Sequence, residues 1–221
     1  MQQIDLHTHH LKNVDSIQVL NIFAQDFSGY KSDSFFSIGL HPWHIGTVNP
    51  ETCLQAIERA AQQKNMLAIG ECGLDRIVAV DFALQKQYFC MQIRIAEKYS
   101  KPLIIHCVHA YSDLLQLKKE TKTEHPWIIH GYRGNKETTQ SLISHGFYFS
   151  VGESLLQDQF KQNTLRMIPT DRLFLETDER TIAIGTIYRQ AAQILRIDEE
   201  KLTELIYSNF KIMFGKDIGD A

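Results

Sequence analysis

Two histidines with the spacing of metal ligands stand near the start of the chain. The stretch IDLHTHH, residues 4–10, places His7 and His9 one residue apart, directly after an apolar run. Alternate side chains of a β-strand point to the same face, so both imidazoles could bind one metal ion. The alternative is the remnant of a histidine tag, which would normally form a longer uninterrupted tract. The spacing therefore favours a metal site on a first strand.

Four further candidate ligands close later apolar runs. The runs LAIGE, PLIIH, WIIH and LFLETD end on Glu71, His106, His130 and Asp178. Singly, such a histidine is often only a hydrogen-bonded polar residue, and Asp178 could cap the helix that follows it. Four neutral imidazoles and two carboxylates together suit a pair of divalent ions, Zn²⁺, Mn²⁺ or Mg²⁺, better than a closed structural zinc site. The predicted metal ligands are His7, His9, Glu71, His106, His130 and Asp178.

Eight short apolar runs are expected to be the strands that position these residues. They cover residues 4–7, 17–24, 35–41, 66–71, 102–107, 127–131, 148–152 and 172–178. From the fourth run onward a helical pattern follows each one, as parallel βα units require. The predicted fold is therefore α/β, a TIM-type (β/α)₈ barrel that forms a single domain over residues 1–221. Because residues 10–35 show no amphipathic helix, the barrel should be trimmed in its first βα units.

The helices between the strands carry recognisable start and stop signals. Asn49 followed by Pro50 predicts the start of a helix that runs towards residue 65, and another helix is expected over 81–100. A third begins with a cap near residue 135 and closes on Gly146, and two more lie around 188–195 and 201–214. Barrel enzymes carry their chemistry at the carboxyl ends of the strands, so the candidate ligands should share one end.

Composition limits the kinds of partner that the chain can have. Its 221 residues are 43% hydrophobic and 22% charged with a formal net charge of −3, so the bulk surface offers no strong attraction for nucleic acid. No segment resembles an apolar membrane span or a signal peptide, as expected of a soluble protein. The four cysteines show no CxxC spacing, which favours buried thiols in a reducing cytoplasm. We therefore expect a cytoplasmic protein that neither associates with a membrane nor needs an obligate protein partner.

Six short motifs follow one another along the chain: DLHTH, GLHP, GECGLD, PLIIHC, IIHGY and LETD. Their order resembles that of the TatD family of metal-dependent deoxyribonucleases, and the closing NFKIMFG is similar to the family's C-terminal N-x-x-x-x-F-G segment. The resemblance runs over nearly the whole chain and implies a hydrolase barrel related to the amidohydrolases. It also implies that His7, His9, Glu71 and Asp178 hold one metal, and that Glu71 bridges to a second metal held by His106 and His130.

Two segments depart from the family pattern. The stretch ETDERTIAIG lacks the proline of the usual E-T-D-S-P, and HGYRG inserts Arg133 where the family usually has H-C-F-S-G. Neither departure removes a predicted ligand. Both concern the substrate rather than the metal chemistry.

The predicted function is hydrolysis of phosphodiester bonds in DNA, as a 3′-5′ exonuclease-like deoxyribonuclease with a transiently bound DNA substrate. Asp178 is the expected general base and Glu71 the second catalytic carboxylate. His41 and Arg133 are expected to contact phosphate, although His41 could be held by hydrogen bonds near Pro42 and Arg133 by a surface ion pair.

Two residues beside these motifs have roles that the sequence leaves open. Trp43 could stack on a base or pack in the core. Asp75 is expected to orient a metal ligand.

Two other functions fit the same residues. A barrel with the same metals could hydrolyse amides, esters or small phosphodiesters instead of DNA. A metal-binding adaptor for nucleic acid would show no turnover, but the complete ligand set and the lack of a Lys/Arg stripe argue against it. Native metal, exact substrate, cleavage mode and oligomeric state are not determined by the sequence.

Overall fold

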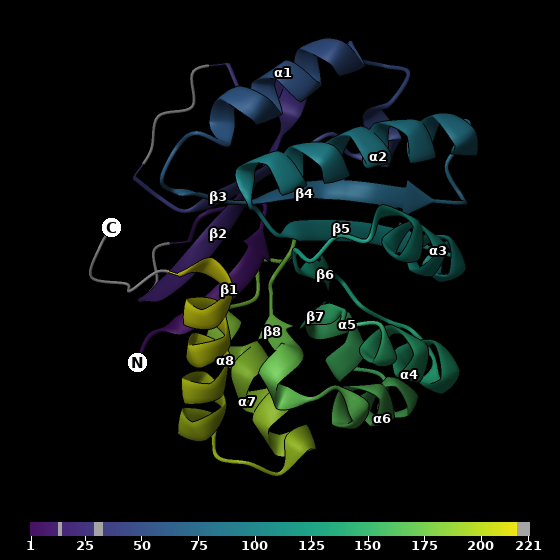
Figure 1. The fold of residues 1–221 in the computed structure, drawn as a ribbon. Coiled ribbons are helices and arrows are strands. Elements are labelled where there is room, and N and C mark those ends of the chain that lie inside the picture. The colour runs from purple at the N-terminus through teal and green to yellow at the C-terminus, as the bar shows by residue number, and fades with distance from the viewer. Residues whose placement is uncertain (13–14, 29–32, 216–221) are drawn as a thin grey trace. The chain divides into compact units, whose positions relative to one another are not determined.

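The computed structural model of the protein describes residues 1–12, 15–28 and 33–215 (Figure 1). Eight strands follow one another in the sheet in chain order: β1 (Gln3–Thr8), β2 (Ser16–Phe23), β3 (Phe36–Gly39), β4 (Met66–Asp75), β5 (Leu103–Val108), β6 (Trp127–Ile129), β7 (Tyr148–Val151) and β8 (Leu173–Leu175). The α-helices are α1 (Pro50–Ala60), α2 (Phe82–Tyr99), α3 (Tyr111–Thr121), α4 (Lys136–Ser144), α5 (Glu153–Leu156), α6 (Gln159–Met167), α7 (Ile184–Leu195) and α8 (Glu199–Phe214). Three short 3₁₀ helices, η1 (Ala24–Asp26), η2 (Pro42–His44) and η3 (Thr170–Arg172), complete the described elements.

Each of the eight predicted strands overlaps an observed one, but several ends differ. Strand β3 stops at Gly39 because Pro42 opens the 3₁₀ helix η2 three residues later. Strand β8 stops at Leu175, before the predicted end at Asp178, whose φ of 55° is left-handed and interrupts extended backbone. Conversely, β4 continues to Asp75 through the GECGLD motif.

The helices follow their sequence signals closely. The Asn49 side chain accepts a hydrogen bond from Thr52 N, and Asp81 caps α2 by accepting one from Leu84 N. Among the described residues between β1 and β3 the only helical segment is η1, in agreement with the predicted trimming of the first βα units. None of the described helices has the length and apolar character needed to cross a membrane.

The chain divides into two compact units that are described separately below. Unit 1 consists of the described residues of Met1–Leu20 and Ile129–Ala221, and unit 2 consists of Asn21–Ile128. The single domain predicted over residues 1–221 stays a prediction.

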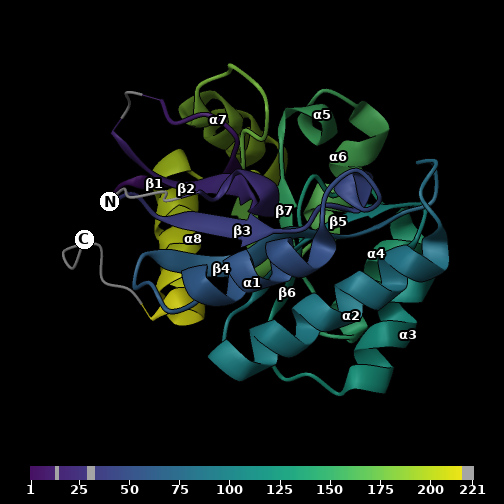
Figure 2. The same ribbon diagram turned by 90° about the horizontal axis from the view of Figure 1, so that it is seen from above.

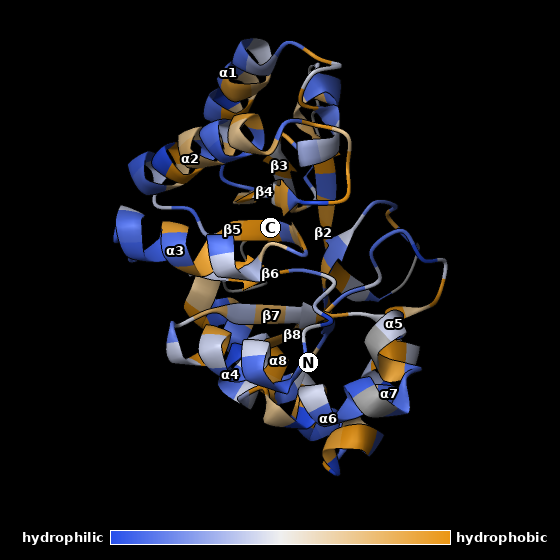
Figure 3. Ribbon diagram, turned by 90° about the vertical axis from the view of Figure 1, so that its right-hand side faces the viewer, coloured by the Kyte–Doolittle hydropathy of each residue, from blue (hydrophilic) through white to orange (hydrophobic). Residues whose placement is uncertain are grey.

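In unit 2 the core lies between parallel strands and the helices that cover them. Helices α1 and α2 pack on β3 and β4 (Figures 1 and 2), and their hydropathy alternates between polar and apolar residues (Figure 3). All ten residues of β4 are buried. A parallel strand with both faces covered reads as a nearly continuous buried run, which explains why Met66–Asp75 lacks polar alternation.

In unit 1 the last two helices pack against the first and last strands. Helices α7 and α8 contact β1 and β8. The buried Tyr188 hydroxyl accepts a hydrogen bond from Ile4 N at 2.9 Å and donates to Ile4 O at 3.1 Å. This pairing ties α7 to the strand that carries the first two predicted ligands.

Glycines allow the strands around Glu71 to approach closely. A Cβ placed on Gly39 would lie 2.5 Å from the Glu71 carbonyl oxygen. Cβ atoms on Gly70 and Gly73 would collide with the carbonyl oxygens of Ile104 and His106, and both glycines have positive φ. The glycines of GLHP and GECGLD therefore set the backbone spacing of β3, β4 and β5.

We predict that Gly39→Ala destabilises the protein by about 1–3 kcal/mol, because the added methyl group meets backbone atoms that cannot move aside independently. The measurement is the free energy of unfolding in urea. Gly185→Ala is the matched control, since its Cβ would meet only the flexible end of Gln3, at 3.1 Å, within helix α7. Equal stability of Gly39→Ala and wild type would contradict the close-packing argument.

Candidate metal sites

The first cluster of candidate ligands lies in unit 1. One ligand atom each from His7, His9 and Asp178 lies within 4.8 Å of the others. Asp178 Oδ1 is 3.4 Å from His9 Nε2 and 3.7 Å from His7 Nε2. The His7 side chain is fully buried, whereas 37% of the Asp178 side chain is exposed. The cluster is therefore open to solvent on the side of its carboxylate.

The backbone fixes this cluster although its members are about 170 positions apart in the sequence. Asp178 N donates to His7 O at 2.9 Å and His9 N donates to Asp178 O at 3.1 Å, so Asp178 forms a parallel bridge with Thr8. The three candidate ligands are thus held by main-chain hydrogen bonds as well as by their side chains. His7 lies on β1, which ends at Thr8, and His9 follows the strand directly. The two residues therefore keep the predicted i, i+2 spacing at the end of the strand.

A buried aspartate supports the same cluster. Asp5 accepts hydrogen bonds from Thr177 N at 2.8 Å and from Thr177 Oγ1 at 2.7 Å. Burial raises the pKa of the Asp5 carboxyl to about 7, although both bonds from Thr177 act to lower it. The Asp5 of DLHTH therefore links β1 to the LETD segment and positions the residues on either side. Sequence reasoning gave Asp5 no role.

His130 and Glu176 lie in unit 1 as well. The His130 ring centroid is 4.4 Å from that of His7, and His130 Nδ1 is 3.4 Å from Glu176 Oε1. Glu176 Oε1 also accepts a hydrogen bond from Gly131 N at 2.6 Å, while Oε2 is buried without a hydrogen-bond partner in the described part of the chain. A carboxylate oxygen buried without a donor is costly unless a cation neutralises it. Glu176 is therefore a candidate ligand or close neighbour of a metal.

The sequence analysis missed Glu176, but a signal for it is present. Glu176 and Asp178 are two residues apart in LETD, which is the spacing that first drew attention to His7 and His9. Residues with this spacing at the end of a strand share a face. The same argument applied to LETD would have added Glu176 to the predicted ligands.

The second cluster lies in unit 2 and contains His41, Glu71 and His106, with one ligand atom of each within 4.8 Å of the others. Glu71 Oε1 is 3.0 Å from His41 Nε2 and 3.0 Å from His106 Nδ1. Glu71 N donates to the side-chain oxygen of Asn21 on β2 at 2.8 Å. Glu71 is almost fully buried, and the hydrogen bond with His41 offsets part of the cost of burying its carboxylate.

The hydrogen bonds of His41 define its tautomer. Its Nδ1 accepts from Trp43 N at 3.1 Å, so a neutral ring carries its proton on Nε2 and donates it to Glu71. The contact of His41 with phosphate stays a prediction. Both ring nitrogens of His41 lie against protein groups, and the residue is only 2% exposed. This geometry favours orientation of Glu71 by His41.

His106 is held from its other side by Asp75. The two side chains meet at 3.0 Å between His106 Nε2 and Asp75 Oδ2. Burial acts to raise the pKa of Asp75, but hydrogen bonds from Trp43, His106 and the backbone of Ile77 outweigh it and lower the pKa below its ordinary value. The ionised carboxylate can accept a hydrogen bond from His106 Nε2–H, which leaves Nδ1 of the neutral ring available to a metal. Asp75 occupies the orienting position expected from the sequence.

Arg133 follows His130 by three residues, in the loop after β6, and is exposed. Among the described residues no carboxylate forms an ion pair with it within 4.0 Å, so the alternative of a surface ion pair is not realised there. Its guanidinium is available to an anionic ligand.

Both clusters fit divalent metal ions by the chemistry of their donors. Each contains imidazole nitrogens and a carboxylate at separations that one ion can span, and neither contains a cysteine. The buried, partnerless Oε2 of Glu176 adds a negative group near His130 in unit 1. The bridging role predicted for Glu71 relates residues of the two units and stays a prediction.

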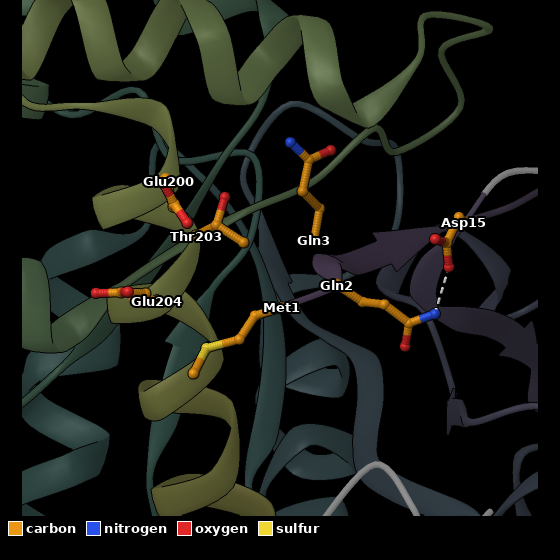
Figure 4. A pocket seen from close by; sticks show the side chains of 7 residues that line it. All are labelled: Met1, Gln2, Gln3, Asp15, Glu200, Thr203 and Glu204. Atoms are coloured by element: carbon orange, nitrogen blue, oxygen red, sulfur yellow. Dashed lines mark hydrogen bonds between the residues drawn. The ribbon is translucent and has the colours of Figure 1, made fainter.

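A cavity of about 340 Å³ in unit 1 is separate from the candidate ligands (Figure 4). It is lined by Met1, Gln2, Gln3, Asp15, Glu200, Thr203 and Glu204. Gln3 begins β1, whereas the ligands follow the carboxyl ends of their strands. The cavity therefore lies at the amino-terminal end of β1, and in barrel enzymes residues at that end contribute to stability rather than to chemistry.

Comparison with known proteins identifies the family. A model of the family described as TatD related DNase matches residues 4–215. The chain is 26% identical over 213 residues to the uncharacterized metal-dependent hydrolase YcfH of Escherichia coli (strain K12), covering 89% of this chain and 79% of that protein. It is 28% identical over 162 residues to the 3′-5′ ssDNA/RNA exonuclease TatD of the same strain, covering 70% of this chain and 61% of that protein.

Solved structures show the same fold. The crystal structure of YJJV, a TatD homolog from Escherichia coli K12, superimposes with a TM-score of 0.81 at 17% identity and covers 97% of this chain and 98% of that one. A hydrolase of the TatD family from Entamoeba histolytica gives a TM-score of 0.80 at 19% identity, with 96% and 98% covered. The predicted TIM-type barrel is confirmed.

The chain belongs to the TatD-related DNase family of metal-dependent hydrolases. The predictions of the family and of a metal-dependent hydrolase are thereby confirmed. The number of ions, their identity and the residues that hold them are not determined by the match.

We predict that Glu176→Gln lowers the affinity of the metal-free protein for Mn²⁺ or Zn²⁺ about tenfold, because the neutral amide keeps the bond from Gly131 but loses the charge near His130. Competition with a chromogenic chelator measures the affinity. Glu204→Gln is the matched control, because that glutamate is 44% exposed and pairs with Lys201 on the surface. Unchanged affinity of Glu176→Gln would exclude Glu176 from the metal site.

Proposed function

We propose that this protein is a nuclease that hydrolyses phosphodiester bonds of single-stranded DNA from the 3′ end, with one divalent ion held in each cluster. His7, His9 and Asp178 would hold the ion in unit 1, with His130 and Glu176 beside them. Glu71 and His106 would hold the ion in unit 2, with His41 and Asp75 orienting them. The names of similar proteins support this substrate class, since one is the 3′-5′ ssDNA/RNA exonuclease TatD of Escherichia coli and another is the deoxyribonuclease Tat-D of Schizosaccharomyces pombe.

The observation that carries the proposal is the contrast between Asp178 and the imidazoles beside it. The carboxylate is 37% exposed, while the side chains of His7 and His9 are 0% and 12% exposed. A group that both binds a metal and meets solvent is placed to exchange protons with a water molecule at the site. The buried imidazoles can hold a cation but cannot reach a substrate.

The residues of the chain would then divide the reaction between them. A bound divalent ion supplies a Lewis acid that acidifies water and withdraws charge from phosphoryl oxygens. Asp178 takes one proton from the attacking water while the oxygen of that water bonds to phosphorus. The P–O bond to the leaving nucleotide breaks, and the proton on Asp178 can pass to the departing oxygen. Water is consumed and one phosphate ester and one alcohol are formed.

Arg133 is the proposed contact for the substrate phosphate. Its planar guanidinium can donate two parallel hydrogen bonds to a phosphate group, and it is exposed three residues after His130. The net charge of −3 offers little general attraction for DNA, so a local cation of this kind matters more than it would on a basic surface.

The proposed activity is tested by cleavage of a 5′-labelled single-stranded DNA oligonucleotide in Mg²⁺, Mn²⁺ or Zn²⁺. We expect a ladder that shortens from the 3′ end. Asp178→Asn should reduce the rate at least a hundredfold, because the amide can neither take a proton nor neutralise the ion. Asp171→Asn, at an exposed aspartate in η3, is the matched control and should cleave like wild type. Full activity of Asp178→Asn with metal bound would exclude Asp178 as the base, and no cleavage with any metal would favour an amide, ester or small phosphodiester substrate.

We also predict that Arg133→Gln lowers kcat/KM for the oligonucleotide about tenfold or more, since a hydrogen bond to a charged group contributes about 1.5–3 kcal/mol. The control is Arg189→Gln, because Arg189 is 63% exposed and lies 3.9 Å from Glu199. A carboxylic ester that the protein hydrolyses should be unaffected by the Arg133 substitution. Equal effects of the two substitutions on DNA cleavage would remove Arg133 from the substrate contacts.

A further inference from the structure

Trp43 is an exposed aromatic residue beside the buried cluster of unit 2. It is 53% exposed, whereas Trp127, the other tryptophan of the chain, is fully buried. It lies in η2, two residues after His41. Of the two roles that the sequence left open for Trp43, packing in the core is therefore excluded. A partly exposed tryptophan offers both an apolar ring face and an indole N–H to a ligand, so its anchoring and neighbours decide what it can do.

A buried carboxylate holds the Trp43 ring in place. Its Nε1 donates to Asp75 Oδ2 at 2.7 Å, and Asp75 is fully buried. The same Asp75 oxygen is 3.0 Å from His106 Nε2. A hydrogen bond to an ionised group is stronger than one between neutral groups, so the indole is fixed in one orientation rather than free to turn.

The ring also contacts the imidazoles of the cluster. Its centroid is 4.8 Å from that of His41 and 5.7 Å from that of His106, with interplanar angles of 79° and 77°. Trp43 is therefore in direct contact with two residues of the candidate metal site. A planar group that lies on its exposed surface would sit next to the candidate metal site of unit 2.

Ile77 is a second exposed apolar residue that is hydrogen-bonded to Asp75. It is 71% exposed, and its backbone N–H donates to Asp75 Oδ1 at 2.9 Å. Asp75 thus binds Trp43 through one oxygen and Ile77 through the other. The Asp75 carboxylate therefore meets the Trp43 indole, the His106 imidazole and the backbone N–H of Ile77.

We propose that Trp43, held by Asp75, stacks on a nucleobase of the substrate strand. The inference rests on the proposed nuclease function and assigns a residue that would select strands with unpaired bases. Every base has a π-face, so an aromatic platform accepts any sequence, and each stacked base contributes a measurable share of affinity. A base within a duplex is already stacked on both faces and offers no free surface to Trp43.

The test measures binding without cleavage. The full-length protein in EDTA is titrated with oligothymidylate of eight nucleotides and, separately, with an abasic phosphodiester of the same length. Quenching of tryptophan fluorescence by oligothymidylate alone is expected, because Trp127 is buried and only Trp43 can meet a base. Trp43→Leu should lose the quenching and weaken oligothymidylate binding about tenfold, while its binding of the abasic strand, followed by competition, should not change.

A second variant separates stacking from anchoring. Trp43→Phe keeps a π-face but lacks the indole N–H that Asp75 accepts, so it should bind oligothymidylate more tightly than Trp43→Leu does. Ile212→Ala, at another exposed apolar residue, is the control and should bind like wild type. Metal affinity of Trp43→Leu, measured by chelator competition, should equal that of wild type.

Three results would overturn the proposal. Equal losses for the oligothymidylate and abasic strands would mean that Trp43 only supports the metal cluster, and so would a fall in metal affinity. Absence of quenching in the wild-type protein would mean that no base reaches Trp43. Because the titration needs no turnover, quenching without hydrolysis in any metal would support stacking by Trp43 and separately refute the nuclease function.

Discussion

A carboxylate that cannot reach water must be given donors or cations, and this constraint organises both clusters. Asp5, Glu71, Asp75 and Glu176 are all at most 4% exposed. Each is held by donors from a neighbouring element, such as Thr177 for Asp5 and Gly131 for Glu176. Buried charges of this kind stabilise only when they are paired with good geometry. The imidazoles that surround them, and any cation bound there, therefore belong to the structure as much as to the chemistry.

The same constraint explains why small residues accompany the ligands. Glu71 is surrounded because β3, β4 and β5 approach more closely than strands with side chains at Gly39, Gly70 and Gly73 could. The close approach brings the imidazoles at the ends of β3 and β5 to within 3.0 Å of one glutamate oxygen. The motif glycines thus have a packing role that is inseparable from the position of the charged group. Substitution there should act on stability and on the site together.

The sequence predicted most of the elements and candidate ligands, for identifiable physical reasons. Parallel strands give apolar runs and their ends gather polar residues, so His7 or Glu71 could be placed from pattern alone. Contacts between distant segments were not accessible in this way. The bonds from Thr177 to Asp5 join positions 172 residues apart, and nothing local to either residue indicates them. Nor does the sequence reveal that Trp43 N donates a hydrogen bond to His41 Nδ1.

In each cluster the buried residues fix the position of their neighbours, whereas the exposed residues are the ones that could contact water or substrate. In unit 1 the fully buried His7 lies beside the partly exposed Asp178, and in unit 2 the buried Asp75 lies beside the exposed Trp43. In both cases the buried group makes the hydrogen bonds or close contacts that fix the exposed one. Preorganisation of this kind lowers the entropy lost when a ligand binds, because the exposed group is already ordered. Exposure of an ordered, well-anchored side chain is therefore a stronger indication of a substrate contact than exposure alone.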